Sequence, residues 1–288
     1  MYADLHLHSS FSDGTYTPEE VVVQAQRHGL AAVALTDHDT VEGCERMRAA
    51  CERAGLEFLP GTELTAEVDG RELHLLAYCL DTEDPPLLAR LATCQEVRQR
   101  RVHEMVARLN ALHVPLAAEA VFQLANCRSP GRPHVARALV QGGFCATLDE
   151  AFERFLKNHR PAWVPKFRMP AAEAIALVHA AGGLAVLAHP ALNRADDLIP
   201  ELAAAGLDGL ECFHTKHSSA VAAYYVRVAE QHHLLVTGGS DCHGVSKGKP
   251  LIGTVRLPFE RVTALRAGVA ARRRLAVPAA RPPAPVSP

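Results

Sequence analysis

Residues 3–39, ADLHLHSSFSDGTYTPEEVVVQAQRHGLAAVALTDHD, contain one complete strand–helix–strand unit. Apolar runs at residues 3–8 and 31–36 predict two strands, and the amphipathic pattern of residues 18–27 predicts a helix between them. Thr17 followed by Pro18 is typical of a helix start, and Gly29 stands where a left-handed cap ends a helix. Strands that alternate with helices predict a parallel sheet with helical crossovers.

The same alternation continues outside this unit and then stops. Further strands are predicted at residues 56–60, 73–79, 184–188, 209–212 and 234–237, with a helix at 42–53. After residue 81 the chain has helical periodicity without a clear strand, at residues 90–112, 119–125, 133–141 and 148–158. We therefore expect an α/β barrel formed by residues 1–81 and 166–278. Residues 82–165 are expected to form a helical cap insertion, and 279–288 a flexible proline-rich tail.

The composition fits a globular protein and excludes several classes. Of the 288 residues, 48% are hydrophobic and 22% are charged, which excludes global disorder and a small disulfide-rich scaffold. The formal net charge of -2 provides no overall basic field for long nucleic acid. The eight Cys form no C-x-x-C pair, and the N-terminus has neither the basic nor the apolar region of a signal peptide. We expect a cytoplasmic protein with no membrane association and no obligate protein partner.

Polar side chains follow the apolar run of nearly every predicted strand. Carboxyl ends of parallel strands meet at one rim of an α/β barrel, where catalytic groups gather. The residues expected at that rim are His6, His8, Asp13, His38, Glu63, His74, His189, Glu211, His214, Asp241 and His243.

Two of these pairs have the spacing of a metal clamp. His6 and His8 lie two residues apart on a strand, so their side chains share a face, and Asp241 and His243 repeat the spacing. A single strand histidine is more often structural than a metal ligand. Many imidazoles and carboxylates at one rim, however, would be poorly paired without cations. Such ligands without thiolate suit zinc, manganese or iron(II), and a carboxylate such as Glu63 could bridge two ions.

These motifs resemble those of the PHP (polymerase and histidinol phosphatase) family. The resemblance is carried by H-L-H-S-x-x-S-D-G at residues 6–14, T-D-H-D at 36–39, Glu63, His74, A-H-P at 188–190 and G-S-D-x-H at 239–243. It implies a distorted (β/α)7 barrel with a trinuclear metal centre.

The resemblance also implies a ligand set for each ion. The first ion is expected at His6, His8, Glu63 and Asp241, the second at Glu63, His74 and His189, and the third at Asp13, His38 and His243. Asp13 stands where some relatives have a histidine. Two to three divalent ions are implied, with Mn²⁺ expected and Zn²⁺ or Fe²⁺ as alternatives. Three such ions against three carboxylates leave a net positive site that suits a phosphate monoester.

The helical insertion resembles the cap of one branch of this family. G-R-P-H-V-A-R at residues 131–137 and F-x-x-F-L at 152–156 are similar to nucleotide-directed PHP phosphoesterases. That branch removes the 3′-phosphate from nucleoside 3′,5′-bisphosphates, and some members trim short RNA from the 5′ end. A small phosphorylated nucleotide, or a short 5′-phosphorylated RNA, is therefore the expected substrate. Arg132 and His134 would bind a second phosphate at a helix start, and the further candidates are Lys157, His159, Lys216 and His217.

The implied chemistry is hydrolysis by a metal-activated hydroxide without a covalent protein intermediate. Glu63, Asp241 and His243 are expected to be catalytic through the metal centre, and His214 or His217 would donate a proton to the leaving oxygen. A histidinol-phosphate-type phosphatase is the alternative within the family. A regulatory PHP module that only binds metal is the non-enzymatic alternative. Residues 266–274 are basic and could contact RNA, but a solvated helix face explains them as well.

Overall fold

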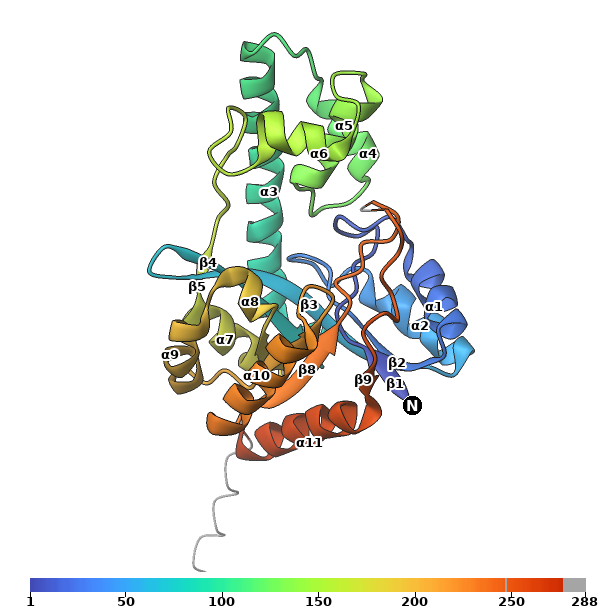
Figure 1. Ribbon diagram of the computed structural model, residues 1–288, viewed down its shortest axis with the longest axis vertical. Helices are drawn as coiled ribbons and strands as arrows, with labels where there is room; N and C mark the ends of the chain where they lie inside the picture. Colours follow the sequence, from blue (N-terminus) through green and yellow to red (C-terminus); the bar gives the residue numbers. More distant parts are fainter. Residues whose placement is uncertain (247, 277–288) are drawn as a thin grey trace, which may run out of the picture.

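A nine-stranded sheet curves into a nearly closed barrel in the computed structural model, which describes residues 1–246 and 248–276 (Figure 1). The strand order is β8-β7-β6-β4-β3-β2-β1-β9, with β5 beside β3. Beyond the paired strands, the Leu5 N–H donates to the carbonyl of Gly238 at 3.2 Å, and Leu7 forms a parallel bridge with Cys242. These contacts bring β1 beside β8, and the predicted α/β barrel is confirmed. The strands are β1 (Tyr2–Asp4), β2 (Leu30–Leu35), β3 (Glu57–Val68), β4 (Arg71–Tyr78), β5 (Met169–Pro170), β6 (Leu184–Leu187), β7 (Gly209–His214), β8 (Leu235–Gly239) and β9 (Leu257–Pro258).

The prediction of an all-parallel sheet is wrong at β4, which runs antiparallel to both β3 and β6. Only Asp69 and Gly70 separate β3 from β4, and both have positive φ, as a tight hairpin requires. A two-residue link leaves no room for the helical crossover that parallel strands need. Strand β3 also extends eight residues beyond its predicted end at residue 60, so Glu63 lies within a strand.

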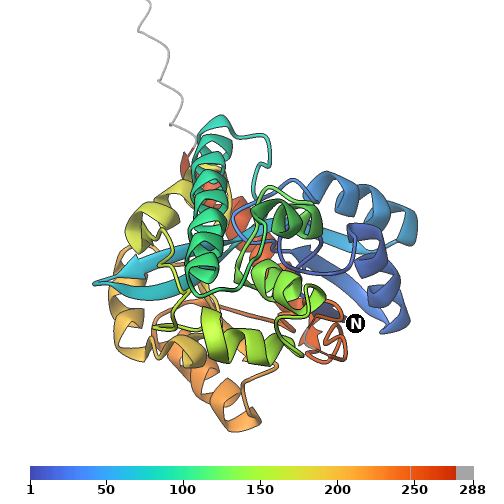
Figure 2. The ribbon, with the colours of Figure 1, turned by 90° about the horizontal axis from the view of Figure 1, so that it is seen from above.

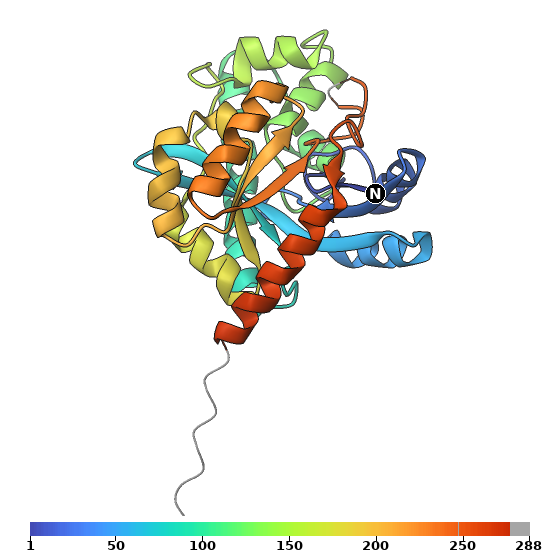
Figure 3. The same ribbon diagram turned by 60° about the horizontal axis from the view of Figure 1, so that its bottom comes forward.

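The helices cover the outside of the barrel and its lower end. Helix α11 lies below the strands in Figure 1, crosses in front of them in Figure 3, and contacts β1, β2, β6 and β8. The helices are α1 (Pro18–Arg27), α2 (Cys44–Ala54), α3 (Pro85–Ala111), α4 (Ala118–Ala125), α5 (Arg132–Gln141), α6 (Leu148–Ala151), the π-helix η1 (Phe152–Leu156), α7 (Ala171–Ala180), α8 (Pro190–Asn193), the 3-10 helix η2 (Asp196–Leu198), α9 (Ile199–Ala204), α10 (Ser219–Gln231) and α11 (Phe259–Ala276). The predicted start of α1 is confirmed, because Thr17 and Glu20 form a reciprocal capping box.

Helices α3 to α6 lie above one end of the barrel, and Figure 2 shows them over the strands. Their apolar side chains, from Val102 to Val164, form a cluster separate from the two barrel clusters. The first turns of α3 belong to the barrel instead, since Leu87, Leu91 and Cys94 pack in its core. One long helix thus joins the barrel to the helices above it. We call residues 95–166, which follow these first turns, the cap.

Three further expectations concern the cysteines, membrane association and the C-terminal tail. The eight Cys are free thiols, seven of them buried. None of the helices in the described part of the chain has the length and apolar character needed to cross a membrane. The predicted tail at 279–288 lies outside the described residues.

Candidate metal centre

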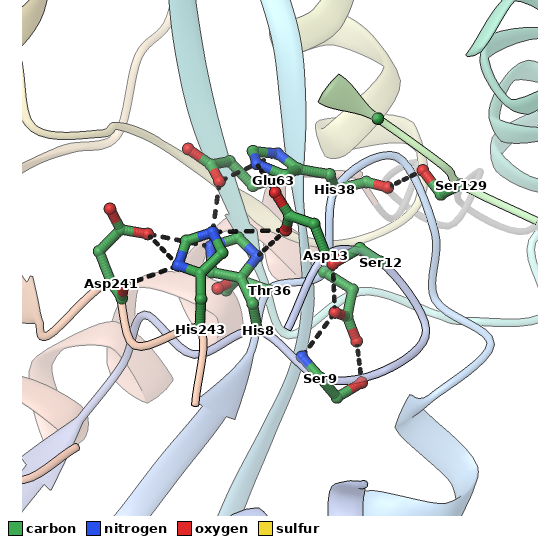
Figure 4. A network of polar contacts seen from close by, with 12 residues as sticks. His8, Ser9, Ser12, Asp13, Thr36, His38, Glu63, Ser129, Asp241 and His243 are labelled. Atoms are coloured by element: carbon green, nitrogen blue, oxygen red, sulfur yellow. Dashed lines mark hydrogen bonds and ion pairs between the residues drawn. The ribbon is translucent and has the colours of Figure 1, made fainter. Parts of the chain in front are cut away.

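Nine side chains converge at the end of the barrel beneath the cap. Ligand atoms lie within 4.8 Å of one another in three groups, which are His8, Asp13, His38 and His243; His6, His8 and Asp241; and His38, Glu63 and His74. His189 joins them through Glu63, since its Nε2 lies 3.1 Å from Oε1 of the carboxylate. The structure thus brings all nine predicted ligands together, and Figure 4 shows six of them pointing toward one another. His74 lies near the start of β4. Because β4 runs antiparallel to β3, its start lies at this end of the barrel.

Glu63 lies at the centre of the cluster with its two oxygens facing different histidines. Oε1 is 2.7 Å from Nδ1 of His74 and 3.1 Å from Nε2 of His189. Oε2 is 3.3–3.4 Å from the Nε2 atoms of His6 and His8. One carboxylate therefore faces two groups of imidazoles, as a bridging ligand must.

The other two carboxylates of the cluster, Asp241 and Asp13, both face His243. Asp241 Oδ1 lies 3.2 Å from Nε2 of His8 and 3.4 Å from Nδ1 of His243. Asp13 Oδ1 lies 3.3 Å from Nε2 of His243. His38 is closer to Glu63 (3.1 Å) than to Asp13 (4.0 Å), so it lies between the second and third predicted sets.

The donor atoms fit divalent cations. Buried ring nitrogens of His6, His8, His38 and His189, with carboxylate oxygens of Asp13 and Glu63, have no hydrogen-bond partner among the described residues. Buried polar atoms without partners are costly, and cations between them would satisfy them. Burial acts to raise the pKa of Glu63, but His38, His74 and His6 hold it well below its usual range. The carboxylate is thus ionised and able to bind a cation at neutral pH.

Hydrogen bonds fix the orientation of the histidine rings. Nδ1 of His6 donates to Oε1 of Glu211 at 2.9 Å, and Nδ1 of His243 donates to the carbonyl of Asp241 at 2.9 Å. Each bond leaves Nε2 of the ring free to face the cluster. Carboxylate or carbonyl partners of this kind are typical behind metal-binding histidines. From the sequence, Glu211 was expected only to lie at the rim. The sequence feature that could have indicated its role in orienting His6 is a carboxylate within a buried strand.

Asp37 holds the loop that carries Asp13. Its carboxylate accepts bonds from the Ser9 N–H (2.7 Å), the Ser9 hydroxyl (2.5 Å) and the Ser12 hydroxyl (2.5 Å). Ser9, Ser12 and Asp37, which belong to two of the sequence motifs, thus bond to one another and orient the loop of Asp13.

A cavity of about 250 Å³ lies between the metal-site residues and the cap. Four cations line its cap side, of which only Arg132 was predicted from the sequence. They are Arg98, Arg101, Arg132 and Lys166, the first two from α3, the third from α5 and the last from the segment before β5. In sequence, Arg98 and Arg101 are indistinguishable from solvated residues of a long helix.

The other predicted phosphate-binding residues lie elsewhere. The expectation for His134 needs correction, because its ring is 1% exposed and its Nδ1 accepts the Gly131 N–H at 3.0 Å. Burial lowers the pKa of His134 to about 4, so it is neutral at pH 7. Lys157, His159 and Lys216 are exposed and do not line the cavity, and Lys157 pairs with Glu153 at 2.6 Å.

The two candidate proton donors lie beside the centre rather than in its cavity. Nδ1 of His214 accepts the Lys216 N–H, and its Nε2 lies 3.7 Å from Oδ2 of Asp241. Nδ1 of His217 donates to the carbonyl of Cys212. Both line a separate groove of about 910 Å³ along α10. Neither residue lines the cavity, but Nε2 of His214 faces Asp241, which does.

The PHP domain family matches residues 4–159, the stretch that contains the ligands from His6 to His74. The chain belongs to the PHP family. A solved structure from Bifidobacterium adolescentis, described as a presumptive metal-dependent phosphoesterase, is similar to this PHP protein with a TM-score of 0.85. The two are 36% identical, and the alignment covers 92% of this chain and 95% of that one.

Three curated relatives are similar over most of their length. The 5′-3′ exoribonuclease Rnm of Salmonella typhimurium is 34% identical, covering 83% of this chain and 84% of the relative. The 3′,5′-nucleoside bisphosphate phosphatase of Chromobacterium violaceum is 32% identical (87% and 90%). The phosphoribosyl 1,2-cyclic phosphate 1,2-diphosphodiesterase of Eggerthella lenta is also 32% identical (88% and 98%). This PHP protein is therefore a phosphoesterase whose site binds divalent metal ions.

Proposed function

We propose that the protein removes the 3′-phosphate from nucleoside 3′,5′-bisphosphates. The observation that supports this substrate most is the two-sided cavity. Ionised carboxylates and imidazoles form its barrel side, and four cations form its cap side. A substrate with one phosphate to be cleaved and a second anionic group would contact both sides.

The cations of the cap side are unequally neutralised. Arg98 pairs with Asp39 at 2.7 Å, and Lys166 pairs with Glu72 at 2.7 Å. Within residues 1–246 and 248–276, Arg101 and Arg132 have only neutral partners. Arg101 donates to the carbonyl of Val164, whereas Arg132 donates to the carbonyl of Leu156 and to Asn158.

Their pKa values reflect this lack of anionic partners. Burial, together with the nearby Arg98 and Arg132, lowers the pKa of Arg101 to about 10. Burial and Arg98 also lower the pKa of Arg132, while Glu72 acts in the opposite direction. Both guanidinium groups remain charged at neutral pH. A phosphate would relieve their mutual repulsion and offer acceptors for both.

We assign the metal centre to the residues that the resemblance implied. His6, His8, Glu63 and Asp241 would hold one ion, Glu63, His74 and His189 a second, and Asp13, His38 and His243 a third. Divalent ions there would lower the pKa of bound water and neutralise charge that develops on the phosphate. Mn²⁺ is the proposed ion, because imidazole and carboxylate donors without thiolate suit it. Metal analysis after purification without chelators tests that assignment, and a stoichiometric Zn²⁺ or Fe²⁺ content would contradict it.

The chain's own residues orient the substrate between the two sides. Glu63 keeps its carboxylate ionised and shared between two groups of histidines. Arg101 and Arg132 would bind the phosphate that is not cleaved. Phe152 and Pro133 add apolar surface to the same cavity, where a nucleoside could pack.

A substrate panel tests the assignment. Orthophosphate release is compared for adenosine 3′,5′-bisphosphate, 3′-AMP, 5′-AMP, histidinol phosphate and phosphoribosyl 1,2-cyclic phosphate, and mononucleotide release for a short 5′-phosphorylated RNA. We expect the highest kcat/KM with the bisphosphate. A clear preference for histidinol phosphate, RNA or the cyclic ester would overturn the substrate but not the phosphoesterase. No turnover on any phosphoester, with metal bound, would favour a regulatory module.

A further inference from the structure

Side chains of the cap contact the barrel rim mainly at two loops, residues 9–14 and 36–42. These loops carry Asp13 and His38, two of the three residues assigned to the third ion. The contacting residues come from α3, from the segment between α4 and α5, and from α5. They are Gln95, Arg98, Cys127, Arg128, Ser129 and Arg137.

Two of the contacts end on the backbone of a ligand residue. The hydroxyl of Ser129, a residue only 1% exposed, donates to the main-chain carbonyl of His38. Nη2 of Arg137 donates to the main-chain carbonyl of Asp13 at 2.5 Å. Figure 4 shows the bond from Ser129 to His38 beside the cluster. A movement of the cap would therefore shift both ligands at their main chain.

A further contact fixes the residue after His38. Nε of Arg98 donates to Oδ2 of Asp39 at 2.7 Å, and Gln95 donates to the carbonyl of Asp39 at 3.2 Å. Asp39 has a φ of 50°, a left-handed conformation that a residue other than glycine keeps when its surroundings fix it. Helix α3 supplies part of those surroundings.

The ligands deeper in the barrel are held differently. His6 and Glu63 are at most 1% exposed, and the barrel residue Glu211 orients His6. The side chains of His38 and Asp13 are 13% and 12% exposed, and both residues accept hydrogen bonds from the cap at their main-chain carbonyls. The contacts of Ser129 and Arg137 are thus concentrated on one part of the centre.

We propose that Ser129 and Arg137 are positioning residues for the third ion, so that docking of the cap and binding of that ion strengthen each other. Such coupling is reciprocal, because an ion that prefers the docked cap must also stabilise it. Arg137 lies on the same helix as Arg132, so a phosphate bound to Arg132 would also favour the third ion. This inference rests on the metal centre assigned under the proposed function.

The test is a Mn²⁺ titration of metal-free protein by calorimetry, with metal content measured after dialysis. Ser129→Ala removes the hydroxyl donor, and Arg137→Met keeps the aliphatic stem but removes the guanidinium. Arg137→Lys retains a charged donor. Arg128→Met is the matched control, because Arg128 bonds to Glu42 from a side chain that is 62% exposed. Thermal unfolding in EDTA measures the stability of each fold without metal.

We expect three binding steps for the parent protein. In Ser129→Ala and Arg137→Met the weakest step should weaken by about 10- to 100-fold, the usual effect of losing an outer partner of a metal ligand. The other two steps should be unchanged, Arg137→Lys should recover much of the affinity, and Arg128→Met should match the parent. Mn²⁺ beyond two equivalents should also slow hydrogen exchange of α5 in the parent protein.

Three outcomes would overturn the proposal. Equal weakening of all three steps, with a lower unfolding temperature in EDTA, would show a general loss of structure. Three unchanged steps in both variants would remove the coupling but leave the metal centre intact. Fewer than three steps in the parent protein would remove the third ion, and no Mn²⁺ binding at all would also refute the assigned centre.

Discussion

Glu211 and His6 are joined by a fully buried hydrogen bond, in which Nδ1 of His6 donates to Oε1 of the carboxylate at 2.9 Å. The second oxygen of Glu211 accepts the main-chain N–H of His189 at 2.8 Å. One side chain therefore holds two proposed metal ligands that are far apart in the sequence. With the Nδ1 proton fixed, Nε2 of His6 presents its lone pair to the cluster.

Glu211→Gln should weaken Mn²⁺ binding by about 10- to 100-fold. A carboxamide has one acceptor oxygen, so one of the two N–H donors would face an NH₂ group. Calorimetric titration of the metal-free variant measures the change. Glu230→Gln, an exposed carboxylate of α10, is the control. Unchanged affinity in Glu211→Gln would show that contacts other than the one with Glu211 orient His6.

Glu63→Gln should lower turnover by several orders of magnitude and reduce the number of bound ions, while the barrel stays folded. The substitution replaces one of two oxygens that face separate histidine groups with a donor. Turnover, metal content and circular dichroism are the measurements. Glu57→Gln, at the start of the same strand, should keep parental activity. Near-normal turnover with full metal in Glu63→Gln would refute the bridging role.

Arg132→Ala should lower kcat/KM for a nucleoside 3′,5′-bisphosphate by roughly 10- to 150-fold, the kinetic equivalent of one charge-assisted contact. It should hardly affect p-nitrophenyl phosphate, which has no second phosphate. Lys157→Ala should affect neither substrate, because Lys157 is exposed and paired with Glu153. Equal losses on both substrates would show that Arg132 contacts the cleaved phosphate or stabilises the fold.

Stability should fall as the pH drops from about 6.5 toward 4, partly through His134. Burial lowers its folded pKa to about 4, whereas the unfolded pKa is about 6.5, so in this window the unfolded chain binds the extra proton. The effect should reach roughly 3 kcal/mol at the low end. In EDTA, His134→Gln should show a smaller loss of unfolding free energy between pH 7 and 5 than the parent. His103→Gln, an exposed histidine of α3, should match the parent. Identical pH profiles for His134→Gln and the parent would contradict the assignment.

The sequence could predict the ligands because their positions follow from local rules. Polar residues that follow the apolar runs of parallel strands reach one rim of an α/β barrel. His74 reaches the rim for a different reason, since it lies near the start of the antiparallel β4. The alternation of strands with helices likewise predicted the barrel. The direction of β4 could not be obtained this way, because the periodicity of an apolar run is the same for parallel and antiparallel strands.

Sequence alone predicted which imidazoles and carboxylates lie together at the rim of the barrel and that helices follow residue 81. Only the tertiary structure decided how Glu63 divides its oxygens, which buried carboxylate orients His6, and which cations face the cavity. Arg98 and Arg101 lie in a helix whose pattern fits a solvated surface, and only the packing of α3 over the rim buries them. His134 shows the reverse, since its place in a motif suggested a ligand contact but its ring caps its own helix. Side-chain burial depends on contacts between distant segments, and such contacts leave no periodic signal in one sequence.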